Sequence, residues 1–107
     1  MDLFRYCSQA SAKSGRELSR EICFEKGIAT LKPMIFSGGD IEKHLNDLYT
    51  LTQSVIQDDK FVIVLGGEHS LSYAPIKAHY ESYQNTSVLQ IDAHSDLRTT
   101  FHGTKFS

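Results

Sequence analysis

An α/β fold with a parallel sheet is the class that this sequence predicts, because two short apolar runs are joined by a helical segment. The runs are residues 61–65 and 87–91, and both lack the polar-apolar alternation of a strand with one solvated face. A helix between two strands allows them to be parallel, with a right-handed crossover. The sequence therefore predicts a strand-helix-strand unit, with each strand followed directly by a polar cluster.

A loop and an amphipathic helix precede the first predicted strand. Residues before about Glu25 mix polar and scattered apolar positions, which is compatible with a polar helix or a loosely packed leader. Pro33 and the glycine pair 38–39 then predict a loop. Apolar or small side chains recur at helical spacing after Asp40, which can cap the free amides of the first turn. They are Ile41, Leu45, Leu48, Thr52 and Val55. We predict a helix from Asp40 to about Asp58.

The strand-helix-strand unit follows. Phe61–Leu65 is rich in β-branched residues and is stopped by two glycines, so we expect a central parallel strand. Ser72 can cap the next helix, in which Pro75 falls in the first turn, where a missing backbone donor is harmless. Asn85–Thr86 breaks this helix, and Ser87–Ile91 is the second predicted strand.

Size, charge and cysteine content exclude several classes of protein. With 107 residues, 40% of them hydrophobic, the chain has room for one small domain or part of one. Eleven basic and thirteen acidic residues give a net charge of −2, which argues against nucleic-acid or membrane partners. No apolar run approaches the roughly 18 residues of a membrane span, and no signal peptide begins the sequence. We expect a cytoplasmic protein with reduced thiols at Cys7 and Cys23.

Ligand-type side chains follow both predicted strands. The carboxyl ends of parallel strands, about 4.8 Å apart, share one sheet edge, where open α/β sheets bind ligands. His69 comes after the first strand, and Asp92, His94 and Asp96 come after the second. If the extended conformation persists, these three alternate residues project to one side. Two carboxylates and an imidazole at one point favour a divalent cation such as Mn²⁺, Fe²⁺ or Zn²⁺.

These residues also have structural and other ligand-binding interpretations. A single histidine at a strand end is more often a hydrogen-bonded structural residue than a ligand, so His69 alone decides little. The Asp-x-His-x-Asp pattern could be a solvated turn, but three alternating ligand types at a strand end favour a metal. The glycine pair 66–67 could cradle a phosphate, although no Gly-x-x-x-x-Gly-Lys pattern is present. His44 and His79 have no partner ligand in sequence, and we assign them no role.

The two polar clusters and their strands carry a family resemblance. Val64-Leu65-Gly66-Gly67-Glu68-His69-Ser70 and Ile91-Asp92-Ala93-His94-Ser95-Asp96-Leu97-Arg98 resemble the first two signature motifs of the ureohydrolases, the family of arginases and agmatinases. Glu68 and the Asp-Leu-Arg sequence of residues 96–98 look more like agmatinases than arginases. Residues 25–31 are similar to the segment before the first helix in that subgroup. The resemblance covers about residues 25–107.

This resemblance implies a three-layer α/β/α fold with a parallel sheet, like that of arginases and deacetylases. It also implies a binuclear manganese site. His69 and Asp96 would hold one ion, His94 the other, and Asp92 would bridge the two. In the family, hydroxide from water shared by the ions attacks the guanidinium carbon of the substrate. For agmatine the products are urea and putrescine. A homo-oligomer, a trimer or a hexamer, is the usual assembly.

Departures from the family pattern predict that the chain, residues 1–107, is one partial domain, an N-terminal or central portion of a ureohydrolase. The family completes its metal site with a later Asp-x-Asp motif, which these 107 residues lack. A catalytic histidine in the agmatinase-like pattern follows a stretch like residues 103–107. His102 precedes that stretch, so no catalytic residue is assigned. The isolated chain is expected to be inactive and to bind metal weakly.

Several functional alternatives stay open at this stage. Arginases, guanidinobutyrases and formiminoglutamases share the two motifs, so the exact guanidino substrate is not fixed. Deacetylase-like amidohydrolases have a related fold, but the Asp-Ala-His-Ser-Asp sequence of residues 92–96 looks less like theirs. A rival of a different class is a non-catalytic, truncated remnant that keeps the fold.

Overall fold

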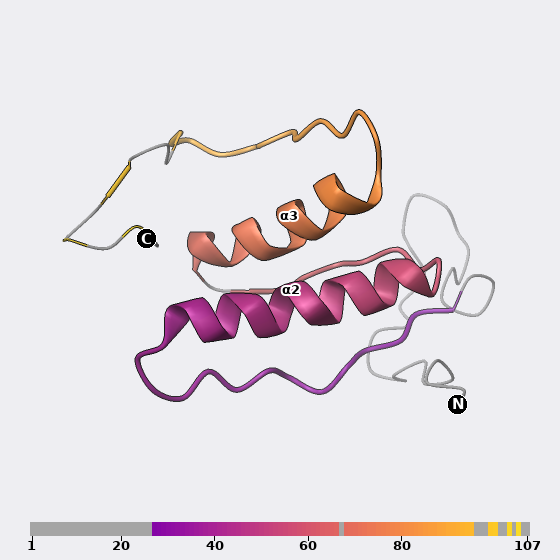
Figure 1. The fold of residues 1–107 in the computed structure, drawn as a ribbon, viewed down its shortest axis with the longest axis horizontal. Coiled ribbons are helices and arrows are strands. Elements are labelled where there is room, and N and C mark those ends of the chain that lie inside the picture. Colours follow the sequence, from indigo (N-terminus) through magenta and orange to yellow (C-terminus); the bar gives the residue numbers. More distant parts are fainter. Residues whose placement is uncertain (1–26, 67, 96–98, 101–102, 104, 106–107) are drawn as a thin grey trace, which may run out of the picture. The chain divides into compact units, whose positions relative to one another are not determined.

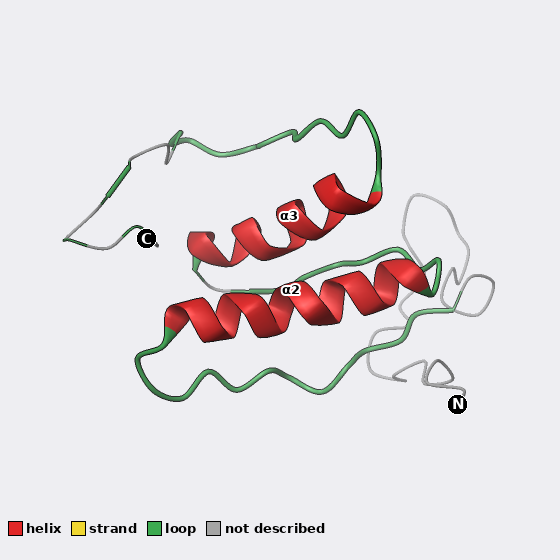
Figure 2. Cartoon of the chain, in the orientation of Figure 1, coloured by secondary structure: helices red, strands yellow, loops and turns green. Residues whose placement is uncertain are grey.

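The structure is a computed structural model that describes residues 27–66, 68–95, 99, 100, 103 and 105. The chain divides into two units, Met1–Ile35 and Phe36–Ser107. In the first unit, residues 27–35 have no regular secondary structure, and the predicted polar helix or leader lies outside the described residues. The second unit contains helix α2 (Ile41–Gln57), the short 3-10 helix η1 (His69–Ser72) and helix α3 (Tyr73–Ser82) (Figures 1 and 2).

Helix α2 confirms the helix predicted from Asp40 to about Asp58. Its N-cap is Asp40, whose Oδ1 accepts a hydrogen bond from the Lys43 backbone N–H at 3.0 Å. This bond satisfies one of the amides that lack a partner at the start of a helix. The buried stripe repeats at three- and four-residue intervals, as an amphipathic helix requires. It consists of Leu45, Leu48, Thr52 and Ile56. Val55, expected in this stripe, is only half-buried, because Ile56, the next residue, provides the fourth buried side chain of the stripe.

The second predicted helix is also present, and Ser72 is its N-cap residue as predicted, but the expected side-chain cap is absent. Pro75 is the third residue of α3 and lies in the first turn, as predicted. Ser72 does not cap the helix with its side chain. The reason is that η1 runs directly into α3, so the Ser72 backbone is already helical, at φ −61° and ψ −27°. A side-chain cap requires the extended backbone that this residue lacks.

Helices α2 and α3 pack side by side, as Figure 1 shows. The face of α3 turned to this contact is made of small residues, since Ala74 and Ala78 are fully buried. At the edge of the contact, the Tyr49 hydroxyl of α2 donates a hydrogen bond to Glu81 of α3. Lys77 Nζ lies 4.8 Å from the centroid of the Tyr49 ring and 4.0 Å from Glu81 Oε1. A hydrogen bond and a cation-π contact therefore join the two helices.

The two predicted strands do not form a sheet among the described residues, where no strand is present. This corrects the expectation of adjacent parallel strands at 61–65 and 87–91. Both segments are irregular and largely exposed: Phe61 and Leu65 are 91% and 92% exposed, and Ile91 is 92% exposed. A strand, unlike a helix, depends on a neighbouring strand for its hydrogen bonds. The three-layer arrangement is therefore not formed by this part of the chain.

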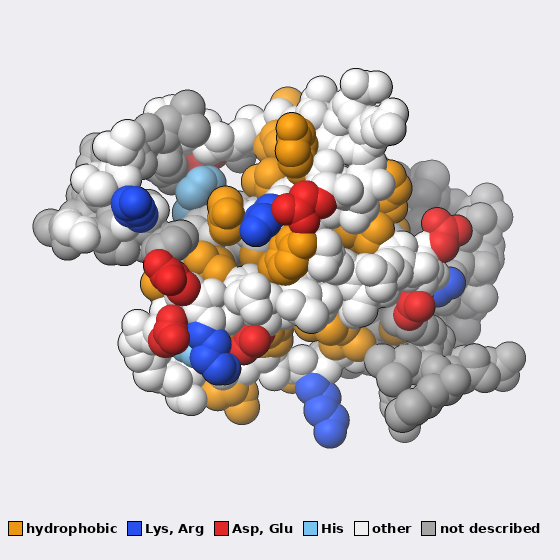
Figure 3. All heavy atoms as spheres, in the orientation of Figure 1, with side chains coloured by type: hydrophobic (Ala, Val, Ile, Leu, Met, Phe, Trp, Pro, Cys, Tyr) orange, Lys and Arg blue, Asp and Glu red, His pale blue; other side chains and the backbone are white. Residues whose placement is uncertain are grey.

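The described surface carries both signs of charge. On the face drawn in Figure 3, basic and acidic side chains are interspersed, with hydrophobic side chains between them. In α2, for example, Lys43 Nζ lies 3.1 Å from Asp47 Oδ2, one turn further along. Among the described helices, none is long and apolar enough to cross a membrane.

Candidate metal site

The first motif forms a tight turn into η1. The Leu71 N–H donates to the Glu68 carbonyl at 3.2 Å, which closes the first turn of the helix that begins at His69. Gly66 is packed closely here, because a Cβ atom at this position would lie 2.9 Å from Leu71 Cδ1. A side chain at position 66 would push Leu71 aside.

Ser70, the residue after His69, has an unusual environment. Its Oγ is shielded from solvent and has no hydrogen-bond partner within the described part of the chain. Buried hydroxyls in folded proteins are normally hydrogen-bonded, and each exception calls for an explanation such as an absent water or ion. Sequence reasoning gave Ser70 no role, since a serine in a motif carries no signal of its burial.

The second motif forms a turn rather than a continuation of a strand. The His94 backbone N–H donates to Asp92 Oδ1 at 3.0 Å, and Gln90 Nε2 donates to the His94 carbonyl at 3.1 Å. An aspartate that accepts from the residue two positions on closes an Asx turn. The His94 Nδ1 atom lies 3.9 Å from the same Asp92 oxygen, and the histidine side chain is 82% exposed. The carboxylate and the imidazole of this motif therefore lie on the same side of the turn.

Of the four predicted ligands, the structure brings Asp92 and His94 together. Asp96 lies outside the described residues. His69 lies in η1, and no group of three or more metal-ligating side chains gathers among residues that the structure describes. The ligand set stays a prediction. Two observations fit a divalent cation: a carboxylate and an imidazole side by side, which is a donor pair that Mn²⁺ and Zn²⁺ accept, and the Ser70 hydroxyl with no partner.

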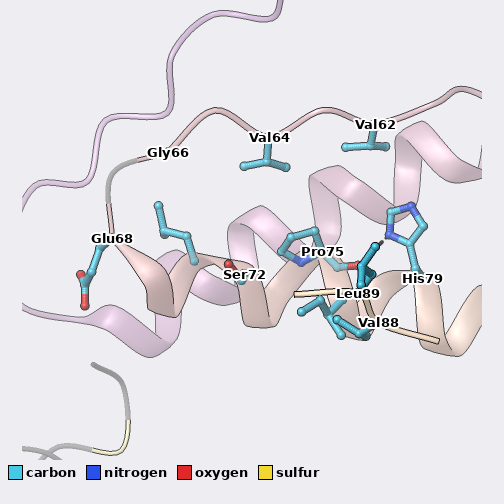
Figure 4. Close-up of a pocket in the computed structure, with 11 residues that line it drawn as sticks. Val62, Val64, Gly66, Glu68, Ser72, Pro75, His79, Val88 and Leu89 are labelled. Atoms are coloured by element: carbon cyan, nitrogen blue, oxygen red, sulfur yellow. Dashed lines mark hydrogen bonds between the residues drawn. The ribbon is translucent and has the colours of Figure 1, made fainter. Parts of the chain in front are cut away.

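A groove of about 390 Å³ lies beside the first motif (Figure 4). Val62 and Val64 on one wall face Pro75 of α3, and Val88 and Leu89 line it as well. His79 lies at one end, where its Nδ1 is 2.7 Å from the Pro75 carbonyl oxygen. Sequence reasoning missed this groove because its lining comes from three separate segments. The apolar side chains that line it, Val62, Val64, Val88 and Leu89, belong to the two segments predicted as strands.

The family of the chain is decided by comparison with known proteins. The model of the Arginase family matches residues 3–107, nearly the whole chain. The chain belongs to the arginase family. Membership in this family of ureohydrolases agrees with the resemblance of the two motifs, and it implies an α/β fold of the arginase type.

Known relatives of this arginase-family chain include several ureohydrolases. An agmatinase of Bacillus subtilis (strain 168) is 33% identical over 79 residues, which cover 67% of this chain and 27% of the relative. A formimidoylglutamase of the same organism is 32% identical over 88 residues, covering 74% and 28%. An N(1)-aminopropylagmatine ureohydrolase of Thermus thermophilus is 30% identical over 83 residues, covering 78% and 28%. The chain thus spans little more than a quarter of these relatives. No solved structure matches it.

Proposed function

We propose that this chain serves metal-dependent hydrolysis of a guanidino C–N bond, with agmatine as substrate and putrescine and urea as products. The observation that carries the proposal is the second motif, where Asp92 Oδ1 and His94 Nδ1 lie 3.9 Å apart in a chain of the arginase family. A carboxylate and an imidazole at this separation can both reach metal ions in one site. Water adds across the C–N bond in this reaction, so no redox cofactor is required.

The proposed ligands are His69, Asp92, His94 and Asp96, for two Mn²⁺ ions. When bound, the two ions supply hydroxide at neutral pH. The residues of the chain do the positioning. Asp92 Oδ1 accepts the His94 backbone N–H, which orients the carboxylate and sets the turn that carries the imidazole. Hydrogen bonds of this kind to ligand carboxylates fix their geometry and tune metal affinity.

The alternative substrate is N-formimidoylglutamate. The observation that favours it is that the formimidoylglutamase is about as similar to this chain as the agmatinase. Both compounds present a planar, nitrogen-rich carbon to a nucleophile, so the metal ligands alone do not discriminate between them. Residues that contact the part of the substrate away from the reacting carbon would discriminate between them, and these residues are not identified within the described part of the chain. Agmatine is preferred because Glu68 and the Asp-Leu-Arg sequence of residues 96–98 resemble agmatinases.

The test is hydrolysis by the complete protein that contains this chain. Purified protein is loaded with Mn²⁺ and offered agmatine, arginine, 4-guanidinobutyrate and N-formimidoylglutamate, each in a separate assay. Urea release from agmatine in excess over the other guanidino compounds is the expected result. A preference for N-formimidoylglutamate, measured as release of glutamate because this compound yields formamide rather than urea, would select the alternative. A folded, Mn²⁺-loaded protein that hydrolyses none of the four would favour the non-catalytic remnant.

Two associated expectations stay predictions. A homo-oligomer, a trimer or a hexamer, is expected for the complete protein, and sedimentation analysis of that protein would test it. A cytoplasmic location is also expected, and cell fractionation would test it. Neither bears on the chemistry of the metal ligands.

A further inference from the structure

The other helical hydroxyls show what Ser70 lacks. In α2 and α3, each serine and threonine donates to a backbone carbonyl one turn earlier, at 2.7 to 2.9 Å. They are Thr50, Thr52, Ser54 and Ser82. This back-bonding is the usual way in which a helical hydroxyl finds an acceptor. Ser70 Oγ also sits in a helical turn, since the Tyr73 N–H donates to the Ser70 carbonyl, but it makes no such bond within the described residues.

The position of Ser70 suggests which acceptor this hydroxyl serves. Ser70 follows His69 directly, at the start of η1, where the Leu71 N–H donates to the Glu68 carbonyl at 3.2 Å. A hydroxyl next to a proposed ligand can orient groups of a metal site through a hydrogen bond. Asp92 offers a matching acceptor: its Oδ1 binds the His94 N–H, while for Oδ2 the described residues give no hydrogen bond.

We propose that Ser70 is a positioning residue of the metal site, with its hydroxyl donating to a ligand carboxylate of the second motif when metal ions draw the two motifs together. Asp92 is the candidate acceptor. The inference rests on the proposed function, because it requires the metal site. This bond would give the shielded Ser70 hydroxyl the acceptor that the described residues do not provide.

This proposal separates stability from metal affinity. An unsatisfied buried hydroxyl lowers the stability of the metal-free protein, so its removal should raise stability. The same removal should weaken metal binding, because loss of a hydrogen bond to a ligand typically costs about 10- to 100-fold in affinity. A merely structural serine would not show this opposition. The two effects have opposite signs and can be measured independently.

The experiment uses the complete protein and three variants, Ser70→Ala, Ser70→Thr and the control Ser82→Ala. The Ser82 hydroxyl is also partly buried, but it is bonded to the Ala78 carbonyl at 2.7 Å. Thermal unfolding is followed by circular dichroism without metal, and Mn²⁺ affinity is measured by calorimetry. Ser70→Ala should raise the melting temperature and weaken Mn²⁺ binding about tenfold or more. Ser70→Thr should retain parental affinity, and Ser82→Ala should lower the melting temperature without changing affinity.

Each other outcome overturns the inference. Unchanged Mn²⁺ affinity in Ser70→Ala would show that the hydroxyl does not serve the site. A melting temperature lowered as in Ser82→Ala, or a failure of Ser70→Ala to fold, would show that the hydroxyl has a structural partner. If the parent protein itself binds no Mn²⁺, the proposed function fails first, and the two failures are thereby distinguished.

Discussion

Truncation of Leu45 to alanine tests whether the buried stripe of α2 holds the helix pair together. Leu45 is 3% exposed, and the large apolar side chains buried with it are Leu48 and Ile56. Leu→Ala changes in a core cost about 2–5 kcal/mol, from lost transfer free energy and from the cavity left behind. Domains have total stabilities of about 5–15 kcal/mol, so this single change should remove a large share.

Urea unfolding, followed by the circular dichroism of the helices, measures the effect. For a small protein the slope is about 1–3 kcal/mol per molar urea, so the midpoint should fall by about 1–5 M. Ile35→Ala is the control: this side chain is 86% exposed, and its loss should change stability by less than about 0.5 kcal/mol. A Leu45→Ala protein with the parental midpoint would refute the assignment of the buried stripe.

Three further predictions concern the metal site and the helix contact. Asp92→Asn in the complete protein should abolish urea release from agmatine and lower the Mn²⁺ content of the protein. The control Asp47→Asn changes a surface aspartate and should leave both intact. An active Asp92→Asn protein with normal metal content would refute the bridging role. Calorimetric titration of Mn²⁺ into the 107-residue chain alone should show weak binding, because only two ligand-type side chains come together among the described residues. Tight binding of two ions would contradict this expectation. The hydrogen bond to Glu81 raises the pKa of Tyr49. The contribution of this bond to stability is therefore present below the unfolded pKa of about 10 and is lost as pH rises through the folded pKa. Melting temperatures between about pH 9 and 12 should fall more steeply for the parent than for Tyr49→Phe, and parallel curves would argue against this bond.

The two helices could be predicted from the sequence because a helix satisfies its backbone within its own segment. The cap at Asp40 and the three- and four-residue spacing of Leu45 and Leu48 are local signals, and both were confirmed. The N-cap position at Ser72 was also confirmed, but its side-chain cap is absent, because whether a 3-10 turn precedes a helix depends on packing around the turn. The contact of Tyr49 with Glu81 had no sequence signal, since it joins residues 32 positions apart.

The sheet could not be obtained from the same local signals. The apolar runs at 61–65 and 87–91 specify side chains suited to a strand buried on both faces, but the hydrogen bonds of a strand belong to its neighbours. The ligand set depends on the same sheet, because His69 and Asp92 were expected at one edge of it. The local part of that prediction, the pair Asp92 and His94, is what a single turn can bring together.

The irregular segment 61–65 has a consequence for how the 107-residue chain behaves in solution. Val62 and Val64 face the groove beside α3, while Phe61, Ile63 and Leu65 are 91%, 74% and 92% exposed. No charged residue interrupts the five, and extended apolar segments of this kind pair readily with copies of themselves. The flanking charges, Asp58–Lys60 before and Glu68 after, are placed to limit such pairing. We therefore expect the chain to self-associate more at high protein concentration and at high ionic strength, since salt screens those flanking charges.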